Sequence, residues 1–203
     1  MKPDLKWDVI VIGGGAAGLM CAAVAAGRGR KVLLLEKNSQ VGRKILISGG
    51  GRCNFTNTGT THEQYYSKNL HFSRSALSMY TAKDFTTLVQ KHGVRFHEKK
   101  LGQLFCDKSA REIVALLLDE CAQGGATVLC DAEVESIEGQ GPYVLETNQG
   151  RLECASLVIA SGGLSIPKIG ATDFGFGIAR QYGLKVTELR PALVPLTFGK
   201  ETF

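Results

Sequence analysis

The chain has 203 residues, of which 44% are hydrophobic and 21% charged, with a mean hydropathy of +0.01; these values exclude an intrinsically disordered chain and suit one sizeable core. Its formal net charge of +5 is distributed over short basic groups rather than along one basic stripe interleaved with aromatic residues, so we do not expect a nucleic acid as a partner. No apolar stretch approaches the roughly 18 residues of a membrane helix, and the N-terminus does not resemble a signal peptide, so we expect a cytoplasmic protein with no membrane partner.

The first 36 residues predict a βαβ unit. Asp8–Ile12 is an apolar run, rich in valine and isoleucine, that is typical of a parallel strand buried on both faces. A small apolar helix is expected over Leu19–Ala26, and Lys31–Leu35 predicts a second buried strand, which ends at Glu36. Between the first strand and the helix lies a glycine turn, Gly13–Gly18, with the spacing GxGxxG. This strand–turn–helix context makes the motif a specific signal for dinucleotide binding.

The rest of the chain alternates helical and strand patterns, which predicts an α/β doubly wound sheet. Residues 41–54 predict a short turn or helix followed by a loop, and residues 57–69 predict a polar loop. Further elements are helices over 72–80, 83–92, 109–121 and 176–182, a hairpin of 94–97 with 103–106, and strands over 127–130, 133–137, 143–147, 151–154 and 156–160.

Each glycine of the turn has a physical role in holding a dinucleotide. Gly13 permits the tight turn, Gly15 lets the backbone approach a pyrophosphate, and Gly18 lets the helix lie close to the strand. The first N–H groups of the helix would point at the phosphates, assisted by the helix dipole. Glu36 is placed to accept hydrogen bonds from ribose hydroxyls; the alternative is a glycine turn with Glu36 facing solvent. FAD and NAD both use this unit, so the unit alone does not decide between them.

The segment that follows Glu36 favours FAD. Residues 41–54, VGRKILISGGGRCN, supply two cations and a three-glycine loop where an ordinary NAD domain has a plain crossover helix. Together with GGGAAG at 13–18, LGQLFCD at 101–107 and VIASGGLSIPKIGATDFG at 158–175, this segment resembles the HI0933-like (BaiN-type) family of NAD(P)/FAD-dependent oxidoreductases, within the flavoproteins that have two dinucleotide-binding domains. The resemblance covers essentially the whole chain and corresponds to the N-terminal half of such a protein.

The resemblance implies a Rossmann-like FAD-binding domain and a set of cofactor contacts. The residues implied are Gly13, Gly15, Ala16 and Ala17 at the pyrophosphate, Glu36 at the adenosine ribose with Lys37 beside it, Arg43, Lys44, Gly51, Arg52, Cys53 and Asn54 along the diphosphate and flavin, Val134 at the adenine edge, and Ala160, Ser161, Gly162 and Gly163 at a strand end beneath the cofactor. Simpler alternatives are exposed charges at Arg43 and Lys44, a small buried residue at Cys53, and a core residue at Val134.

The resemblance also implies a domain boundary. Flavoproteins of this class carry an inserted substrate domain and a C-terminal, glycine-rich return to the FAD domain, and neither is recognisable in this sequence. We therefore expect residues 1–190 to form an FAD-binding domain whose C-terminal part is absent. Residues 191–203, which include Pro191 and Pro195, are expected to begin the inserted domain.

The implied function is that of an FAD-dependent oxidoreductase, in which electrons pass from NAD(P)H through the flavin to a small-molecule substrate such as an activated C=C bond in a ring. No residue is predicted to be a general acid or base, and six cysteines without a CxxC pair predict no metal site. Three alternatives stay open. The chain could be an FAD-binding RNA-modification protein, supported by its charge of +5 and its arginine-rich groups; a plain NAD-dependent dehydrogenase; or a catalytically idle FAD-binding fragment.

Overall fold

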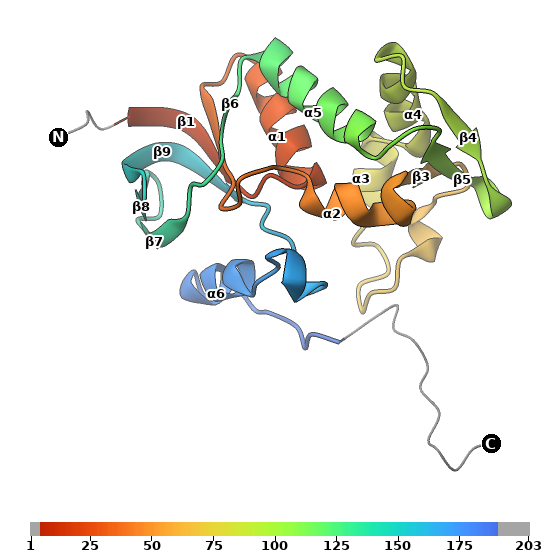
Figure 1. Ribbon diagram of the computed structural model, residues 1–203. Coiled ribbons are helices and arrows are strands. Elements are labelled where there is room, and N and C mark those ends of the chain that lie inside the picture. The colour runs from red at the N-terminus through yellow and green to blue at the C-terminus, as the bar shows by residue number, and fades with distance from the viewer. Residues whose placement is uncertain (1–4, 191–203) are drawn as a thin grey trace. The chain divides into compact units, whose positions relative to one another are not determined.

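A computed structural model describes residues 5–190, and the chain divides into two compact units, residues 1–160 and 161–203. The first unit is built on a six-stranded sheet (Figure 1). In spatial order its strands are β6 (Thr127–Leu129), β2 (Val32–Leu35), β1 (Leu5–Ile12), β9 (Gly150–Ile159), β8 (Tyr143–Thr147) and β7 (Val134–Glu138). The first four run parallel, whereas β8 and β7 pair antiparallel at one edge.

Two helices pack together against the parallel strands. α1 (Ala16–Gly27) and α5 (Arg111–Gly124) lie side by side (Figure 1), and the Cys121 thiol donates a hydrogen bond of 3.2 Å to the carbonyl oxygen of Leu19. Their apolar side chains form one buried cluster with Val11 of β1 and with Val32 and Leu34 of β2. All four residues of β2 are buried, which confirms the prediction of a strand covered on both faces.

A smaller sheet belongs to the same unit. Its order is β3 (Asn54–Asn57), β5 (Gln103–Cys106) and β4 (Phe96–Glu98), and the antiparallel pairing of β4 with β5 confirms the predicted hairpin. The helices of this region are α2 (Arg43–Ile47), α3 (Arg74–Met79) and α4 (Ala82–Lys91). The ring of Phe55 on β3 lies edge-on to Phe85 of α4 and Phe96 of β4, with centroid distances of 6.0 and 5.4 Å, so aromatic contacts hold α4 on the sheet.

Several predicted elements differ from those observed, and three of the differences have a clear structural cause. α1 begins at Ala16 rather than Leu19, because Gly15 already has the extended backbone of an N-cap, with φ −80° and ψ −174°. Residues 54–57 form β3 instead of a loop, since they pair with β5. The two strands expected over 151–154 and 156–160 are one strand, β9, because both halves pair in register with β1.

In the second unit the structure describes residues 161–190. Its helix α6 (Phe174–Gln181) confirms the helix expected over 176–182, although it begins two residues earlier. Residues 191–203 lie outside the described residues, so the inserted domain and the boundary at 190 stay predictions. Within residues 5–190 no helix is long and apolar enough to cross a membrane.

Candidate dinucleotide-binding site

The glycine turn leaves open space at the start of α1. Gly13 has a φ of 110°, and a Cβ added at Gly18 would lie 1.9 Å from the carbonyl oxygen of Gly13, so both positions require glycine. At Gly15, in contrast, an added Cβ would meet no atom within 4 Å. Two glycines therefore shape the turn, and the third marks the open position that a pyrophosphate would approach.

The N-terminus of α1 has no internal anion. Gly15 supplies no side-chain cap, and the first turn contains no acidic residue. The first N–H groups of a helix have no partner within the helix and carry the positive end of its dipole. Ala16 and Ala17, the first two residues of the helix, are exposed. This arrangement suits a phosphate group.

Glu36 is 8% exposed, and its carboxylate forms a hydrogen bond with the backbone of the glycine turn. Oε2 accepts a hydrogen bond of 2.8 Å from the N–H of Gly14, and Oε1 accepts one of 2.8 Å from the N–H of Asn38 and another from the Asn38 side-chain amide. Glu36 therefore does not face solvent. A carboxylate offers about four acceptor positions, so one on Oε2 is left for a ribose hydroxyl. The ribose contact stays a prediction.

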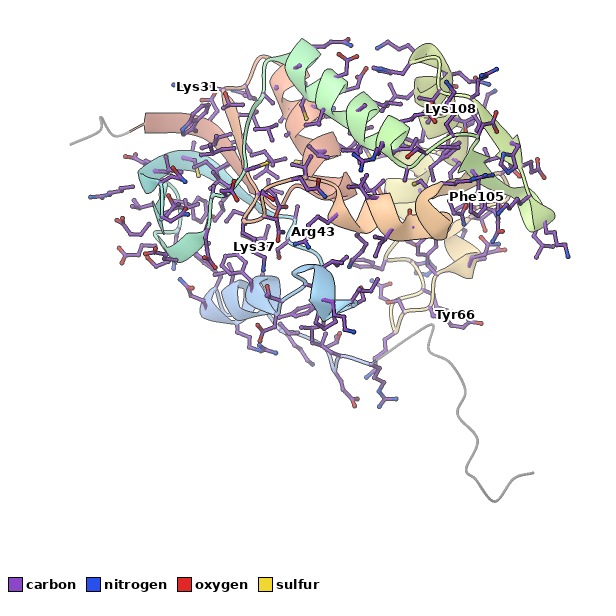
Figure 2. All side chains as sticks on the ribbon, viewed as in Figure 1. Lys31, Lys37, Arg43, Tyr66, Phe105 and Lys108 are labelled. Carbon is purple, nitrogen blue, oxygen red and sulfur yellow. The ribbon has the colours of Figure 1, made fainter. Side chains whose placement is uncertain are left out.

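Arg43 joins this network through Asn38. Its guanidinium donates a hydrogen bond of 2.5 Å to Oδ1 of Asn38, and the N–H of the preceding Gly42 donates one of 2.8 Å to the carbonyl oxygen of Gly14. Arg43 is half-buried, whereas Lys37 is exposed at the same end of the sheet (Figure 2). Sequence reasoning missed Asn38, although an amide two residues after a carboxylate is a common local hydrogen-bond partner.

Two further predicted residues lie beside the turn. The N–H of Ala132 donates a hydrogen bond of 3.0 Å to the carbonyl oxygen of Glu36, and the half-buried Val134 begins β7 two residues later. Ala160 follows β9, and its N–H donates a hydrogen bond of 2.8 Å to the carbonyl oxygen of Ile12, at the end of β1. The fold thus gathers the glycine turn, Glu36, Arg43, Val134 and Ala160 at one end of the parallel strands.

A second group of predicted residues lies beyond α2. Gly49, Gly50 and Gly51 have φ values of 57°, 67° and 82°, a left-handed run that only glycine adopts readily. The carbonyl oxygen of Gly51 accepts a hydrogen bond of 2.7 Å from the N–H of Ala110, and that of Arg52 accepts one of 2.9 Å from the N–H of Cys106. Gly51, Arg52, Cys53 and Asn54 are therefore fixed against β5 and the start of α5. The exposed Lys44 lies between the two groups, on α2.

Ser161, Gly162 and Gly163 belong to the second unit, immediately after Ala160. The Oγ atom of Ser161 is buried and forms no hydrogen bond within the described part of the chain. A buried hydroxyl without a partner costs about 1–3 kcal/mol, which a polar ligand atom would recover. An added Cβ at Gly162 would meet nothing within 4 Å. Taken by itself, this strand end of the second unit suits a polar ligand group.

The six cysteines are free thiols, and burial raises the pKa of each. At Cys53 a hydrogen bond with the Ser48 side chain opposes the effect of burial on the pKa in part, and at Cys106 burial together with the nearby Cys53 raises the pKa to about 12. Protonated thiols are poor nucleophiles and poor metal ligands. Among the described residues no group of three or more His, Cys, Asp or Glu could hold a metal ion.

The raised thiol pKa values predict slow alkylation of the folded protein. We expect iodoacetamide at neutral pH to modify the native chain at least about tenfold more slowly than the urea-unfolded chain, because only the thiolate reacts. Mass spectrometry of the intact protein over time measures both rates. Rapid loss of one thiol in the native protein, above all Cys53, would instead indicate an activated cysteine.

The buried hydrogen bonds of Glu36 predict a stability role that does not depend on a cofactor. Glu36→Gln replaces one acceptor oxygen by an NH₂ group that must face a backbone N–H, so we expect the free energy of unfolding to fall by about 1–3 kcal/mol. Urea unfolding of cofactor-free protein measures the change. The control is Glu135→Gln, an exposed carboxylate on β7, which is expected to stay within about 0.5 kcal/mol of the parent. Equal stability of both variants would contradict the structural role of Glu36.

A family model described as the HI0933-like protein Rossmann domain matches residues 7–199. The chain belongs to the HI0933-like family. This confirms the family that the motifs at 13–18, 41–54, 101–107 and 158–175 predicted.

Among curated relatives of this HI0933-like chain, the ribosomal RNA dihydrouridine synthase of Escherichia coli (strain K12) is 50% identical over 196 residues, which cover 96% of this chain and 49% of that protein. The protein of the same name from Haemophilus influenzae is 47% identical over 93% of this chain and 48% of its own length. A 3-dehydro-bile acid delta(4,6)-reductase of Clostridium scindens is 28% identical over 95% and 48%. The chain spans about half the length of the curated relatives it matches.

Solved structures support the same fold. A flavocytochrome c3 fumarate reductase covers 89% of this HI0933-like chain with a TM-score of 0.60 at 19% identity, over 41% of its own length. Glycine oxidase from Geobacillus kaustophilus covers 89% with a TM-score of 0.55 at 17% identity, over 59% of its length. At these identities the likeness concerns the fold alone, and it confirms the Rossmann-type fold.

One prediction is wrong. The names of the Escherichia coli and Haemophilus influenzae relatives describe enzymes that act on RNA, which contradicts the expectation that a nucleic acid is not a partner. The expectation considered only consecutive basic residues. Cations that are distant in sequence can be gathered on one surface by folding, and phosphate contacts depend on that surface.

Proposed function

We propose that this protein is an FAD-dependent oxidoreductase that reduces uridine in ribosomal RNA to dihydrouridine. The observation that carries the proposal is the 50% identity, over 96% of the chain, with the ribosomal RNA dihydrouridine synthase of Escherichia coli. The FAD-binding Rossmann fold supports it, because reduction of a pyrimidine ring needs a hydride donor that amino-acid side chains do not provide. An RNA substrate also replaces the small-molecule substrate expected at first.

The proposed reaction adds a hydride and a proton across the C5=C6 bond of uracil, which is conjugated to the C4 carbonyl. Bound FAD would supply the hydride after being reduced by NAD(P)H, so the balance is uridine, NAD(P)H and a proton on one side and dihydrouridine and NAD(P)⁺ on the other. The name of the Clostridium scindens relative also describes the reduction of double bonds in a ring. The names of these relatives therefore share one type of reaction, the reduction of a C=C bond in a ring.

The residues of this chain would bind and orient the cofactor. The N–H groups at the start of α1, next to the open position at Gly15, would hold the pyrophosphate. Glu36 would accept a hydrogen bond from the ribose through the remaining acceptor position on Oε2. Arg43, held by Asn38, would place a positive charge near the diphosphate.

The proposal is tested in the source organism by deletion of the gene. Ribosomal RNA from parent and deletion strains is digested to nucleosides, and dihydrouridine is quantified by mass spectrometry. We expect dihydrouridine to be lost from ribosomal RNA and restored by the parent gene, but not by a gene carrying Gly15→Asp, which is designed to block the pyrophosphate position. Unchanged dihydrouridine in the deletion strain would overturn the proposed substrate.

The cofactor is tested separately on purified protein. We expect the absorption bands of oxidised flavin, release of FAD on denaturation, and bleaching of the bands when NADH or NADPH is added without oxygen. Protein that stays colourless after incubation with FAD would overturn the cofactor assignment. Bleaching by neither nicotinamide would overturn the proposed electron donor alone.

A further inference from the structure

Lysine and arginine residues are concentrated in two segments, residues 28–44 and residues 52–111, and the second is the longer. Residues 52–111 contain ten lysine and arginine residues against four aspartate and glutamate residues, a net charge of +6, whereas the whole chain carries +5. The remaining 143 residues are therefore slightly acidic. The same segment holds eight of the fifteen Phe, Tyr and Trp residues. This is the combination of cations and aromatic rings that nucleic-acid-binding proteins use.

Folding places this segment at one end of the first unit. β3, β4, β5, α3 and α4 lie together, away from the β6–β2–β1–β9 strands (Figure 1). Of its ten cations only Lys91 forms an ion pair, at 3.0 Å from Glu120, among the residues that the structure describes. The other nine are exposed and have no carboxylate within ion-pair distance in the described chain: Arg52, Lys68, Arg74, Lys83, Arg95, Lys99, Lys100, Lys108 and Arg111.

The aromatic side chains of the segment are of two kinds. Phe55 packs edge-on against Phe85 and against Phe96. Residues 63–72, in contrast, are all exposed, and they include Tyr66, which is fully exposed, and Phe72, which is 79% exposed. Rings that bury little of their surface within the protein are available to stack on a ligand, and soluble domains rarely expose several of them in one place.

The turn between β4 and β5 is fixed to residues 57 and 58, which lie five residues before this exposed stretch. The side-chain amide of Asn57 donates a hydrogen bond of 2.7 Å to the carbonyl oxygen of Leu101, and the N–H of Thr58 donates one of 2.9 Å to that of Gly102. The turn presents Lys99 and Lys100. Leu101 itself has a φ of 59° and is 90% exposed, an unfavourable conformation for a leucine that the two hydrogen bonds hold in place.

We propose that residues 63–74 and 99–101, here called the aromatic–basic face, bind single-stranded RNA. Bases would stack on Tyr66 and Phe72, and phosphates would contact Lys68, Arg74, Lys99 and Lys100. Figure 2 labels Tyr66, Phe105 and Lys108 on the part of the unit that carries this face. The choice of RNA rests on the proposed function and on the net charge of +6 over residues 52–111, which complements a polyanion.

Single-stranded RNA fits this surface better than a duplex. A base that is to be reduced must leave its stack, so the enzyme gains by holding the neighbouring nucleotides unstacked. Exposed aromatic rings bind unstacked bases of any sequence, whereas the grooves of an RNA duplex offer no base face to a ring. The face would therefore position the strand, and the choice of uridine would belong to the flavin site.

The test measures the affinity of the purified protein for a fluorescein-labelled oligouridine of about 16 nucleotides by fluorescence anisotropy at several salt concentrations. We expect the double variant Tyr66→Ala/Phe72→Ala to bind about tenfold more weakly with an unchanged salt slope, since it loses stacking and no charge. We expect Lys99→Ala/Lys100→Ala to weaken binding to a similar degree and to reduce the slope of log K against log salt by about 1.4, which corresponds to two lost phosphate contacts.

Matched controls separate this face from general charge effects. Arg28→Ala/Arg30→Ala removes two exposed cations that lie outside residues 52–111, and Val24→Ala removes an exposed apolar group from α1; both are expected to keep the parent affinity. All variants are expected to retain the parent melting temperature and flavin content. An equal loss in the arginine pair, or parent-like binding in both face variants, would overturn the proposal.

Other occupants of the face give different results. If a second copy of the chain covers it, Tyr66→Ala/Phe72→Ala would change the sedimentation coefficient and leave the affinity for oligouridine unchanged, which would overturn the RNA assignment. The proposed function can fail separately from the RNA-binding face. If the variants lose RNA affinity as expected but the gene-deletion strain keeps its dihydrouridine, the RNA-binding face is supported and the proposed reaction is overturned.

Discussion

Gly15→Asp is expected to abolish FAD binding while making the cofactor-free protein slightly more stable. Gly15 is the N-cap of α1, its φ and ψ of −80° and −174° are accessible to any residue, and an added Cβ meets no atom within 4 Å. Aspartate is among the best N-cap residues and lies at the positive end of the helix dipole, so the apo protein gains about 0.5 kcal/mol. The new carboxylate accepts hydrogen bonds from the N–H groups that a pyrophosphate needs. Its charge repulsion with the pyrophosphate costs about 3 kcal/mol, which lowers the affinity for FAD at least about 100-fold.

The two halves of this result are measured independently. Thermal unfolding of cofactor-free protein reports the stability, and titration with FAD, followed by flavin fluorescence, reports the affinity. Gly15→Asn is the matched control, because it keeps the cap and the size of the side chain but not the charge; an intermediate loss of affinity is expected. Parent-like FAD binding by Gly15→Asp would place the pyrophosphate elsewhere and contradict the proposed site.

The βαβ unit could be predicted from the sequence because its signals are local. A run of four apolar residues, a GxGxxG turn and a second apolar run each describe backbone geometry within a few residues, and β1, α1 and β2 appear where those signals lie. Two predicted starts are wrong: β1 begins at Leu5 rather than Asp8, and α1 begins before Leu19, which has a local cause. The sequence places the first apolar helical residue at Leu19, whereas helical backbone begins three residues earlier, at a position without a marking side chain.

The remaining differences depend on pairing between distant segments. β3 is polar and half-exposed, and only the neighbouring β5 makes it a strand. The continuity of β9 depends on β1, which lies more than 140 residues earlier in the chain. The internal hydrogen bonds of Glu36 depend on Gly14 and Asn38 being brought to its carboxylate. The GxGxxG motif therefore identified Glu36 as a site residue but did not predict that Glu36 is buried. The basic segment, too, is evident only when charges are summed over 60 residues.

The sequence predicted the cofactor-binding residues as a single set, whereas the fold places them in two separate groups. The motif residues near the glycine turn meet at the ends of β1 and β2, because a βαβ unit always returns there. Gly51–Asn54 are held instead against β5 and α5 by backbone hydrogen bonds that no motif encodes. The pyrophosphate and ribose contacts that we propose involve the first group only. We therefore expect substitutions in the second group to change the flavin environment more than the affinity for the adenosine half.

Gly18→Ala is expected to lower the free energy of unfolding by more than about 3 kcal/mol, although it adds only one methyl group. The Cβ would lie 1.9 Å from the carbonyl oxygen of Gly13, a backbone atom that also shapes the turn, so α1 must move away from β1. Overpacking of this kind costs about 1–3 kcal/mol where side chains can yield, and more where only backbone can.

Gly27→Ala is the matched control for Gly18→Ala, because it makes the same change in the same helix at a position where a Cβ meets nothing within 4 Å. It is expected to be neutral or to stabilise the protein by up to about 1 kcal/mol, through the higher helix propensity of alanine. Urea unfolding of both variants without FAD measures the difference. If the two alanines had similar effects, the contact between α1 and β1 would be looser than the 1.9 Å approach implies, and Gly18 would be retained for the ligand rather than for the fold.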